Sequence, residues 1–138
     1  MPSVLIIGAS RGIGHELARQ YVADGWRVLA TARKKDDCEA LRRLGAHPYL
    51  LDVTSADSIA GLGWNLDGEE LDAAFFVAGV YGPRHDGFPV QADFDNVMAI
   101  NVKGPYLFAR ACLRTMIRAR AGHILNIGSF ASERVIEA

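Results

Sequence analysis

The sequence has little of what marks secreted, metal-binding or nucleic-acid-binding proteins. Its two cysteines, Cys38 and Cys112, lie far apart without a C-x-x-C pair, and its four histidines lack metal-site spacing. Fifteen basic and 16 acidic residues leave a net charge of −1, so no basic excess points to nucleic acid or an anionic membrane. The early apolar run is too short for a membrane span, and no basic segment precedes it as in a signal peptide. We therefore expect a reduced, cytoplasmic protein with no metal, nucleic-acid or membrane partner.

Strand and helix patterns alternate along the 138 residues, half of which are hydrophobic, as expected for one domain with a sizeable core. Expected strands are Ser3–Ile7, Arg27–Ala32, Pro48–Val53, Ala73–Ala78 and His123–Gly128. Expected helices are Ile13–Ala23, Asp37–Leu44, one that follows the capping-box pattern Thr54–Asp57, and Asp93–Ala121 with an interruption near Asn101–Pro105; a loop spans Gly79–Pro89.

Such alternating units form a parallel sheet with right-handed crossovers. The sequence therefore predicts one α/β domain over residues 1–138, a Rossmann-like doubly wound parallel sheet with strand order 3-2-1-4-5. The first two helices should cover one face and the later ones the other. Ligands of such folds bind beyond the carboxyl ends of the strands, where the strand order reverses between strands one and four.

A glycine-rich turn connects the first expected strand to the first expected helix, in the order Gly8-Ala9-Ser10-Arg11-Gly12-Ile13-Gly14. Gly8 permits a sharp turn, Gly12 lets the main chain approach a ligand, and Gly14 lets the helix pack close to the strand. The first N–H groups of the helix have no internal partner, which favours an anion there. We predict a dinucleotide pyrophosphate at this turn; the alternative is a tight turn that binds nothing.

Arg33 directly follows the second expected strand, where NAD-binding folds place a carboxylate that accepts from the ribose 2′-hydroxyl. No carboxylate occurs there before Asp36. Because a guanidinium binds phosphate through a fork of N–H groups, Arg33 favours NADP over NAD, and Arg11 is a second candidate ligand of the 2′-phosphate. The alternative is a pair of solvated arginines.

The G-x-x-x-G-x-G spacing, with Ser10-Arg11 inside it, resembles the short-chain dehydrogenase/reductase family. The resemblance extends over essentially the whole chain and implies NADP-dependent hydride transfer between the nicotinamide and a small carbonyl or alcohol substrate. The segment Val77–Pro83 is similar to small carbonyl reductases of the sniffer and C-signal type. Three segments depart from the family: Ile7 replaces the threonine before the first glycine, Phe76-Val77 replace two asparagines, and Gly128 replaces the first of two serines after the fifth strand.

The resemblance also assigns roles to residues at the ends of the later strands. Asp52 and Val53 would contact the adenine, although Asp52 could instead help to start the next helix. Ala78 and Gly79 would let the cofactor's ribose approach. The main-chain carbonyl of Asn101 would hold a water molecule in a proton relay, with a helix break as the alternative.

Ser129 is the last of the assigned residues and matches the family serine that hydrogen-bonds the substrate oxygen. The alternative is that Ser129 is a serine of a turn without a catalytic role. The family's proton donor, a Tyr-x-x-x-Lys pair, is missing: the residues four positions after the four tyrosines are Gly25, Val53, His85 and Arg110.

The resemblance matches only the N-terminal part of the family's unit, so we expect a truncated chain without the last strands and helices. The fifth strand would then be an edge, and we expect poor solubility or homo-oligomer formation. A non-catalytic NADP(H)-binding module remains the rival function. A P-loop NTPase is excluded because no G-K-[ST] follows the glycines.

Overall fold

A computed structural model of the chain describes residues 1–84 and 87–129. Its strands are β1 (Ser3–Ile7), β2 (Arg27–Ala32), β3 (His47–Leu50), β4 (Ala73–Phe76) and β5 (His123–Asn126). Its helices are α1 (Gly12–Ala23), α2 (Lys35–Leu44), α3 (Ala56–Leu66), α4 (Gln91–Met98), the π-helical segment η1 (Ala99–Lys103) and α5 (Gly104–Ala119).

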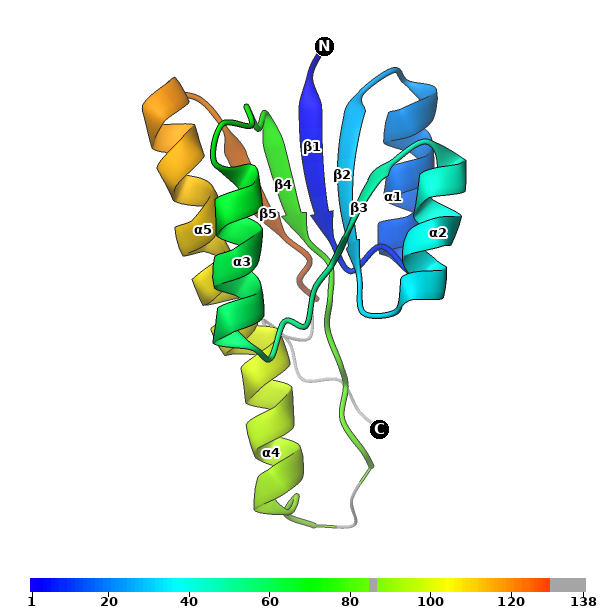
Figure 1. The fold of residues 1–138 in the computed structure, drawn as a ribbon. Coiled ribbons are helices and arrows are strands. Elements are labelled where there is room, and N and C mark those ends of the chain that lie inside the picture. Colours follow the sequence, from blue (N-terminus) through cyan, green and yellow to red (C-terminus); the bar gives the residue numbers. More distant parts are fainter. Residues whose placement is uncertain (85–86, 130–138) are drawn as a thin grey trace.

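The five strands form one parallel sheet in the order β3-β2-β1-β4-β5. Helices α1 and α2 lie on one face of the sheet, and α3 and α5 lie on the other (Figure 1). This confirms the Rossmann-like fold, the strand order and the expected placement of α1, α2, α3 and α5, whereas α4 has no buried residue and extends beyond the sheet (Figure 1).

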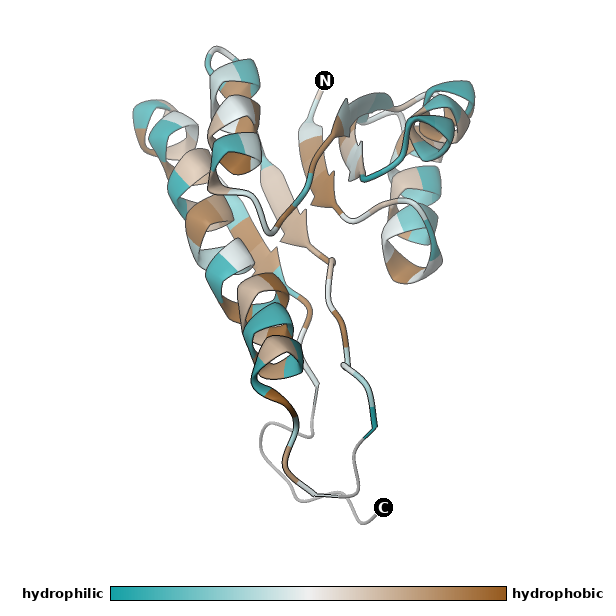
Figure 2. Ribbon diagram, turned by 60° about the horizontal axis from the view of Figure 1, so that its bottom comes forward, coloured by the Kyte–Doolittle hydropathy of each residue, from teal (hydrophilic) through white to brown (hydrophobic). Residues whose placement is uncertain are grey.

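Strand β1 is the centre of the core, because all five of its residues are buried. Alternate side chains of a strand point to opposite faces. Val4 and Ile6 accordingly pack with α1 and α2, whereas Leu5 and Ile7 pack with α3 and α5. The strands are predominantly apolar and hydrophilic residues gather on the helices (Figure 2). The glycine turn that follows β1 is thus attached to the most completely buried strand.

Several element boundaries differ from the sequence-based expectation. Strand β4 ends at Phe76 because the N–H groups of Val77 and Ala78 both donate to the Ile7 carbonyl, at 2.9 and 3.0 Å, which ends the regular ladder. The cap of α3 is Ser55, whose hydroxyl accepts from the Ser58 N–H at 3.1 Å, rather than the expected Thr54. Both shifts reflect hydrogen bonds that a local residue pattern does not specify.

The expected interruption near Asn101 is a π-helical segment rather than a break between helices. In η1 the Gly104 N–H donates to the carbonyl of Ala99, five residues earlier. Pro105, the next residue, has no N–H, so the Asn101 carbonyl lacks the donor that a regular α-helix would supply. Helices α4 and α5 are therefore continuous, with a local change of pitch at Asn101.

Within residues 1–84 and 87–129, β5 pairs with β4 alone and forms one edge of the sheet. Apolar side chains are exposed on β5 and on the neighbouring α5: Leu125 is 39% exposed and Ile117 is 69% exposed. The expectation that strand five forms an edge next to exposed apolar surface is confirmed for this part of the chain.

Candidate cofactor-binding site

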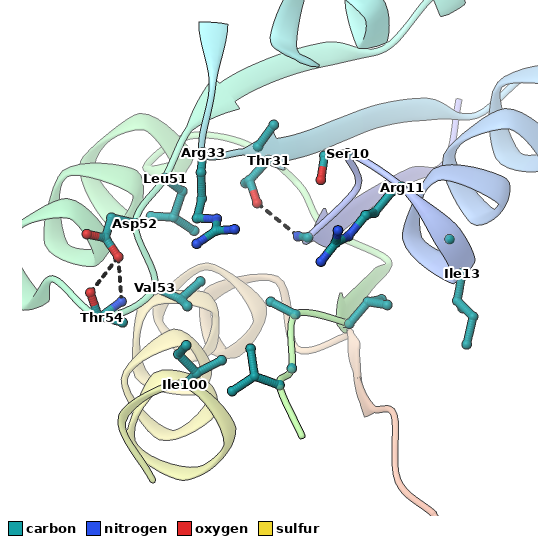
Figure 3. A pocket seen from close by; sticks show the side chains of 17 residues that line it. Ser10, Arg11, Ile13, Thr31, Arg33, Leu51, Asp52, Val53, Thr54 and Ile100 are labelled. Carbon is teal, nitrogen blue, oxygen red and sulfur yellow. Dashed lines mark hydrogen bonds between the residues drawn. The ribbon is translucent and has the colours of Figure 1, made fainter. Parts of the chain in front are cut away.

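A cleft of about 300 Å³ opens at the carboxyl ends of β1, β2, β3 and β4. This volume is at the lower end of the range for small-molecule sites. Every residue predicted to bind the cofactor lines the cleft except Gly14, which is buried behind it. The lining residues come from five segments: the glycine turn, the ends of β2, β3 and β4, and η1, which contributes Ile100 (Figure 3). Residues up to 92 positions apart in the sequence therefore meet at the place where a doubly wound sheet binds ligands.

The glycine turn leaves no room for side chains at two of its positions. Gly8 has a φ of +88°, and a Cβ there would lie 2.7 Å from the main-chain nitrogen of Ala78. A Cβ on Gly14 would overlap the Gly8 carbonyl oxygen. The start of α1 therefore lies directly against the end of β1 at Gly14, and the end of β1 lies against the segment after β4 at Gly8. Helix α1 begins at Gly12, and its cap residue Arg11 makes no side-chain capping bond, so among residues 1–84 and 87–129 the first N–H groups of the helix have no side-chain partner.

Thr31 on β2 holds the beginning of this turn. Its hydroxyl oxygen accepts from the Gly8 N–H at 3.1 Å, and its carbonyl oxygen accepts from the Ala9 N–H at 2.9 Å. Thr31 is 2% exposed and lines the cleft. Local sequence gives no sign of this role, because a threonine within an apolar strand is an ordinary strand former.

Two cations face the cleft from different elements. Arg11 belongs to the glycine turn and Arg33 follows β2, and both side chains point into the cleft (Figure 3). Both residues are exposed, so a bound anion would not have to be extracted from water completely. Local sequence gave the positions of the two arginines but not their common direction.

Asp52 follows β3 and has a defined local role. Its Oδ1 accepts from the N–H of Thr54 at 2.9 Å and from the hydroxyl of Thr54 at 2.6 Å. These two bonds and the more distant charge of Arg33 lower the pKa of Asp52. The carboxylate is therefore ionised at neutral pH and shapes the turn before α3, as the alternative interpretation of Asp52 expected. Val53, next to it, is buried and also lines the cleft.

The end of β4 forms the opposite wall of the cleft, where Ala78 and Gly79 lie. Asn101 fastens this wall: its Oδ1 accepts from the Val80 N–H at 2.9 Å, and its Nδ2 donates to the Val80 carbonyl at 2.7 Å. Phe76, one of the residues that depart from the family pattern, is buried against Phe108 with ring centroids 5.5 Å apart. Apolar packing on α5 thus supports the strand at the place of the missing asparagine.

The two predicted catalytic residues lie outside the cleft lining. Asn101 is on η1 behind the wall that it fastens, and Ser129 is exposed, three residues beyond the end of β5. Ser129 follows the carboxyl end of β5, whereas Asn101 reaches the segment after β4 through its bonds to Val80. Of the additional cleft residues that the sequence analysis did not single out, Leu51 and Ile100 are buried and apolar. Apolar periodicity marks them as core residues and carries no signal for a ligand.

Comparison with known proteins agrees with the fold and the cleft. The short chain dehydrogenase family matches residues 2–137. Dehydrogenase/reductase SDR family member 6 of Xenopus laevis is 32% identical over 135 residues, which cover 94% of this chain and 52% of that protein. NADP-dependent 3-hydroxy acid dehydrogenase YdfG of Escherichia coli K12 is 32% identical over 136 residues, covering 93% and 54%.

Solved structures give the same result. A metagenomic short-chain oxidoreductase in complex with NADP is similar with a TM-score of 0.84 and 35% identity, over 98% of this chain and 65% of the other. A short-chain dehydrogenase from Streptomyces avermitilis gives a TM-score of 0.88 at 26% identity, over 96% and 51%. The fold is that of the Rossmann-type nucleotide-binding proteins.

The chain belongs to the short-chain dehydrogenase family, an oxidoreductase family in which NADP-dependent relatives are found. It spans about half the length of the curated relatives that it matches. In the part of the chain that the structure describes, no helix combines the length and apolar character needed to cross a membrane.

Proposed function

We propose that the chain binds NADP in the cleft and serves an oxidoreductase that interconverts a small carbonyl compound and its alcohol. The combination of the glycine turn with Arg11 and Arg33 carries this proposal. The turn offers unpaired N–H groups to the pyrophosphate, and the two guanidinium groups suit the 2′-phosphate. The cofactor fits the residues present, because the space next to Gly12 that a Cβ would fill is open to a phosphate and a cation stands at the end of β2.

The remaining cleft residues have separate binding roles in this proposal. Asp52 uses the carboxylate oxygen that Thr54 does not occupy to accept from the adenine amino group, and Val53 offers a main-chain donor. The small residues Ala78 and Gly79 let the ribose approach β4. When bound, the nicotinamide supplies or accepts the hydride in the reaction.

The proposed roles of Ser129 and Asn101 concern the substrate side. The Ser129 hydroxyl donates to the substrate oxygen and polarises the carbonyl group without becoming a nucleophile. The main-chain carbonyl of Asn101 would accept from residue 105 in a regular α-helix, but Pro105 has no N–H. In this proposal the carbonyl instead accepts a hydrogen bond from a water molecule of a proton relay. The Asn101 side chain is already committed to Val80, so only its carbonyl is assigned this role.

Isothermal titration calorimetry with NADPH and NADH tests the binding step. We expect heat with NADPH, weaker heat with NADH, and a higher melting temperature when NADPH is present, because a ligand of the folded state stabilises it. The absence of heat and of a melting shift with both coenzymes would overturn the proposal.

The rival function is NADP(H) binding without turnover. It is favoured by one observation: no tyrosine of the chain has a lysine four residues later. Consumption of NADPH with a panel of aldehydes and ketones distinguishes the two functions. Turnover supports the oxidoreductase, whereas tight NADPH binding without turnover supports the module. We also propose a cytoplasmic location and a homo-oligomeric state for this protein.

A further inference from the structure

The hydrogen bond between Thr31 and the glycine turn joins two residues that are 23 positions apart and both line the cleft. Gly8 is the residue at which the chain leaves β1 with a positive φ. Its N–H donates to the Thr31 hydroxyl oxygen and to no other described atom. Ile7, the residue before it, has an apolar side chain that is completely buried in the core. The Thr31 hydroxyl is therefore the polar anchor at the start of the turn.

Thr31 is itself rigidly held. It lies in β2, where its main chain is paired with Tyr49 of β3, and it is 2% exposed. As a β-branched residue in a central strand it has restricted freedom about χ1, so its hydroxyl stays in one place. The anchor is thus a fixed atom of the sheet that meets a segment containing three glycines in seven residues.

Glycines give the turn the freedom to approach a ligand, but that freedom must be lost when the ligand binds. A contact that orders the turn before binding reduces this cost. When only a fraction of the protein molecules is competent to bind, the apparent affinity falls in proportion to that fraction. We propose that Thr31 is a positioning residue for the cofactor: its hydroxyl holds Gly8 so that the turn is preordered for the phosphates.

This inference rests on the proposed NADP binding, and its test includes a measurement that needs no cofactor. Thr31→Val keeps the shape of the side chain and removes the acceptor. We expect it to raise the dissociation constant of NADPH about tenfold, which corresponds to the net worth of one hydrogen bond. Thr31→Ser keeps the hydroxyl and should bind NADPH like the unchanged protein. Thr31→Ala is a second variant without the hydroxyl, in case the valine variant does not fold.

Thr115 provides a matched control for an effect on stability alone. Thr115 lies on α5, away from the cleft, and is also a buried threonine, 7% exposed. Its hydroxyl donates to the Glu69 carbonyl at 2.5 Å. Thr115→Val removes a buried hydroxyl in the same way. We expect a lower melting temperature for this variant and an unchanged affinity for NADPH.

Amide hydrogen exchange without cofactor measures the anchor directly. In Thr31→Val the Gly8 amide should exchange about tenfold faster than in the unchanged protein. The Ala9 amide should change less, because it donates to the main-chain carbonyl of residue 31, which valine retains.

Three results would overturn the inference: Thr31→Val binds NADPH as the unchanged protein does, Thr31→Ser fails to restore binding, or Thr115→Val weakens binding equally. If the unchanged protein binds neither coenzyme, the proposed function fails and hydrogen exchange decides the role of Thr31. An unchanged exchange rate of the Gly8 amide in Thr31→Val then refutes the anchor, and faster exchange supports it.

Discussion

Reversing the charge of Arg33 tests the assigned cofactor preference most directly. Arg33 is exposed and points into the cleft from the end of β2, where it also lowers the pKa of Asp52. Its guanidinium is proposed to bind a 2′-phosphate that NADPH carries and NADH lacks. We therefore expect Arg33→Asp to weaken NADPH binding strongly and NADH binding little.

The size of the effect follows from two contributions. Loss of a charge-assisted hydrogen bond costs about 1.5 kcal/mol at an exposed site, the low end of its range. Repulsion between the new carboxylate and a phosphate of about two charges at roughly 6 Å adds about 1.5 kcal/mol in water. Together they weaken NADPH binding about 100-fold. NADH binding should change less than about threefold, because no phosphate is involved.

Dissociation constants measured by calorimetry at low and high salt check this prediction, and screening should reduce the difference between the coenzymes at high salt. Arg33→Lys keeps the charge and loses the planar fork, so its NADPH affinity should lie between those of the unchanged protein and Arg33→Asp. Arg43→Asp, on the exposed last turn of α2, makes the same charge change away from the cleft and should leave both affinities unchanged. Equal losses of NADPH and NADH affinity in Arg33→Asp would refute the assignment of the 2′-phosphate to Arg33.

Three further predictions concern the turn, the acid stability and the association of the chain. Gly14→Ala should destabilise the fold by about 3 kcal/mol or more and abolish coenzyme binding, because its Cβ would overlap the Gly8 carbonyl. Gly61→Ala, in open space on α3, is the control and should stabilise the fold by about 1 kcal/mol. Urea unfolding measures both effects. Equal melting temperatures of the two variants would contradict this. The lowered pKa of Asp52 contributes stability that is present above the unfolded-state pKa of about 3.9 and is lost as pH falls through the folded-state pKa. Asp52→Asn should therefore flatten the loss of stability on acidification below about pH 4, and parallel curves for the two proteins would argue against the lowered pKa. Sedimentation velocity should show association of the chain that Ile117→Lys reduces; a monodisperse monomer at all concentrations speaks against the homo-oligomer.

Much of the fold could be predicted because its signals are local. The apolar run of β1, the glycines after it and the alternation of strand and helix patterns each lie within a few neighbouring residues. Parallel strands with right-handed crossovers then leave few possible strand orders, and the structure has the expected one. The same rules place the strand ends at one edge of the sheet, which is why the predicted cofactor residues other than Gly14 share one cleft.

Element ends and the pitch of the long helix were predicted less well. The capping pattern indicated Thr54, but the hydroxyl of Thr54 donates to Asp52 and the cap passes to Ser55. Asn101 and Pro105 indicated an interruption, with a break between two helices as the alternative, yet the helix continues through a π-helical segment packed on the core through the buried Ile100. In both cases several local arrangements were open to the same residues, and packing selected one of them.

By itself, the sequence determined the parallel sheet, the glycine turn and the cation at the end of β2, because periodicity and backbone sterics act between neighbouring residues. Tertiary structure alone decided that the Thr31 hydroxyl meets the Gly8 N–H and that the Asn101 amide fastens Val80. These contacts join residues 23 and 21 positions apart. They arise only when the sheet and its helices pack together, because the polar partners are brought within hydrogen-bond distance by the burial of the apolar side chains around them.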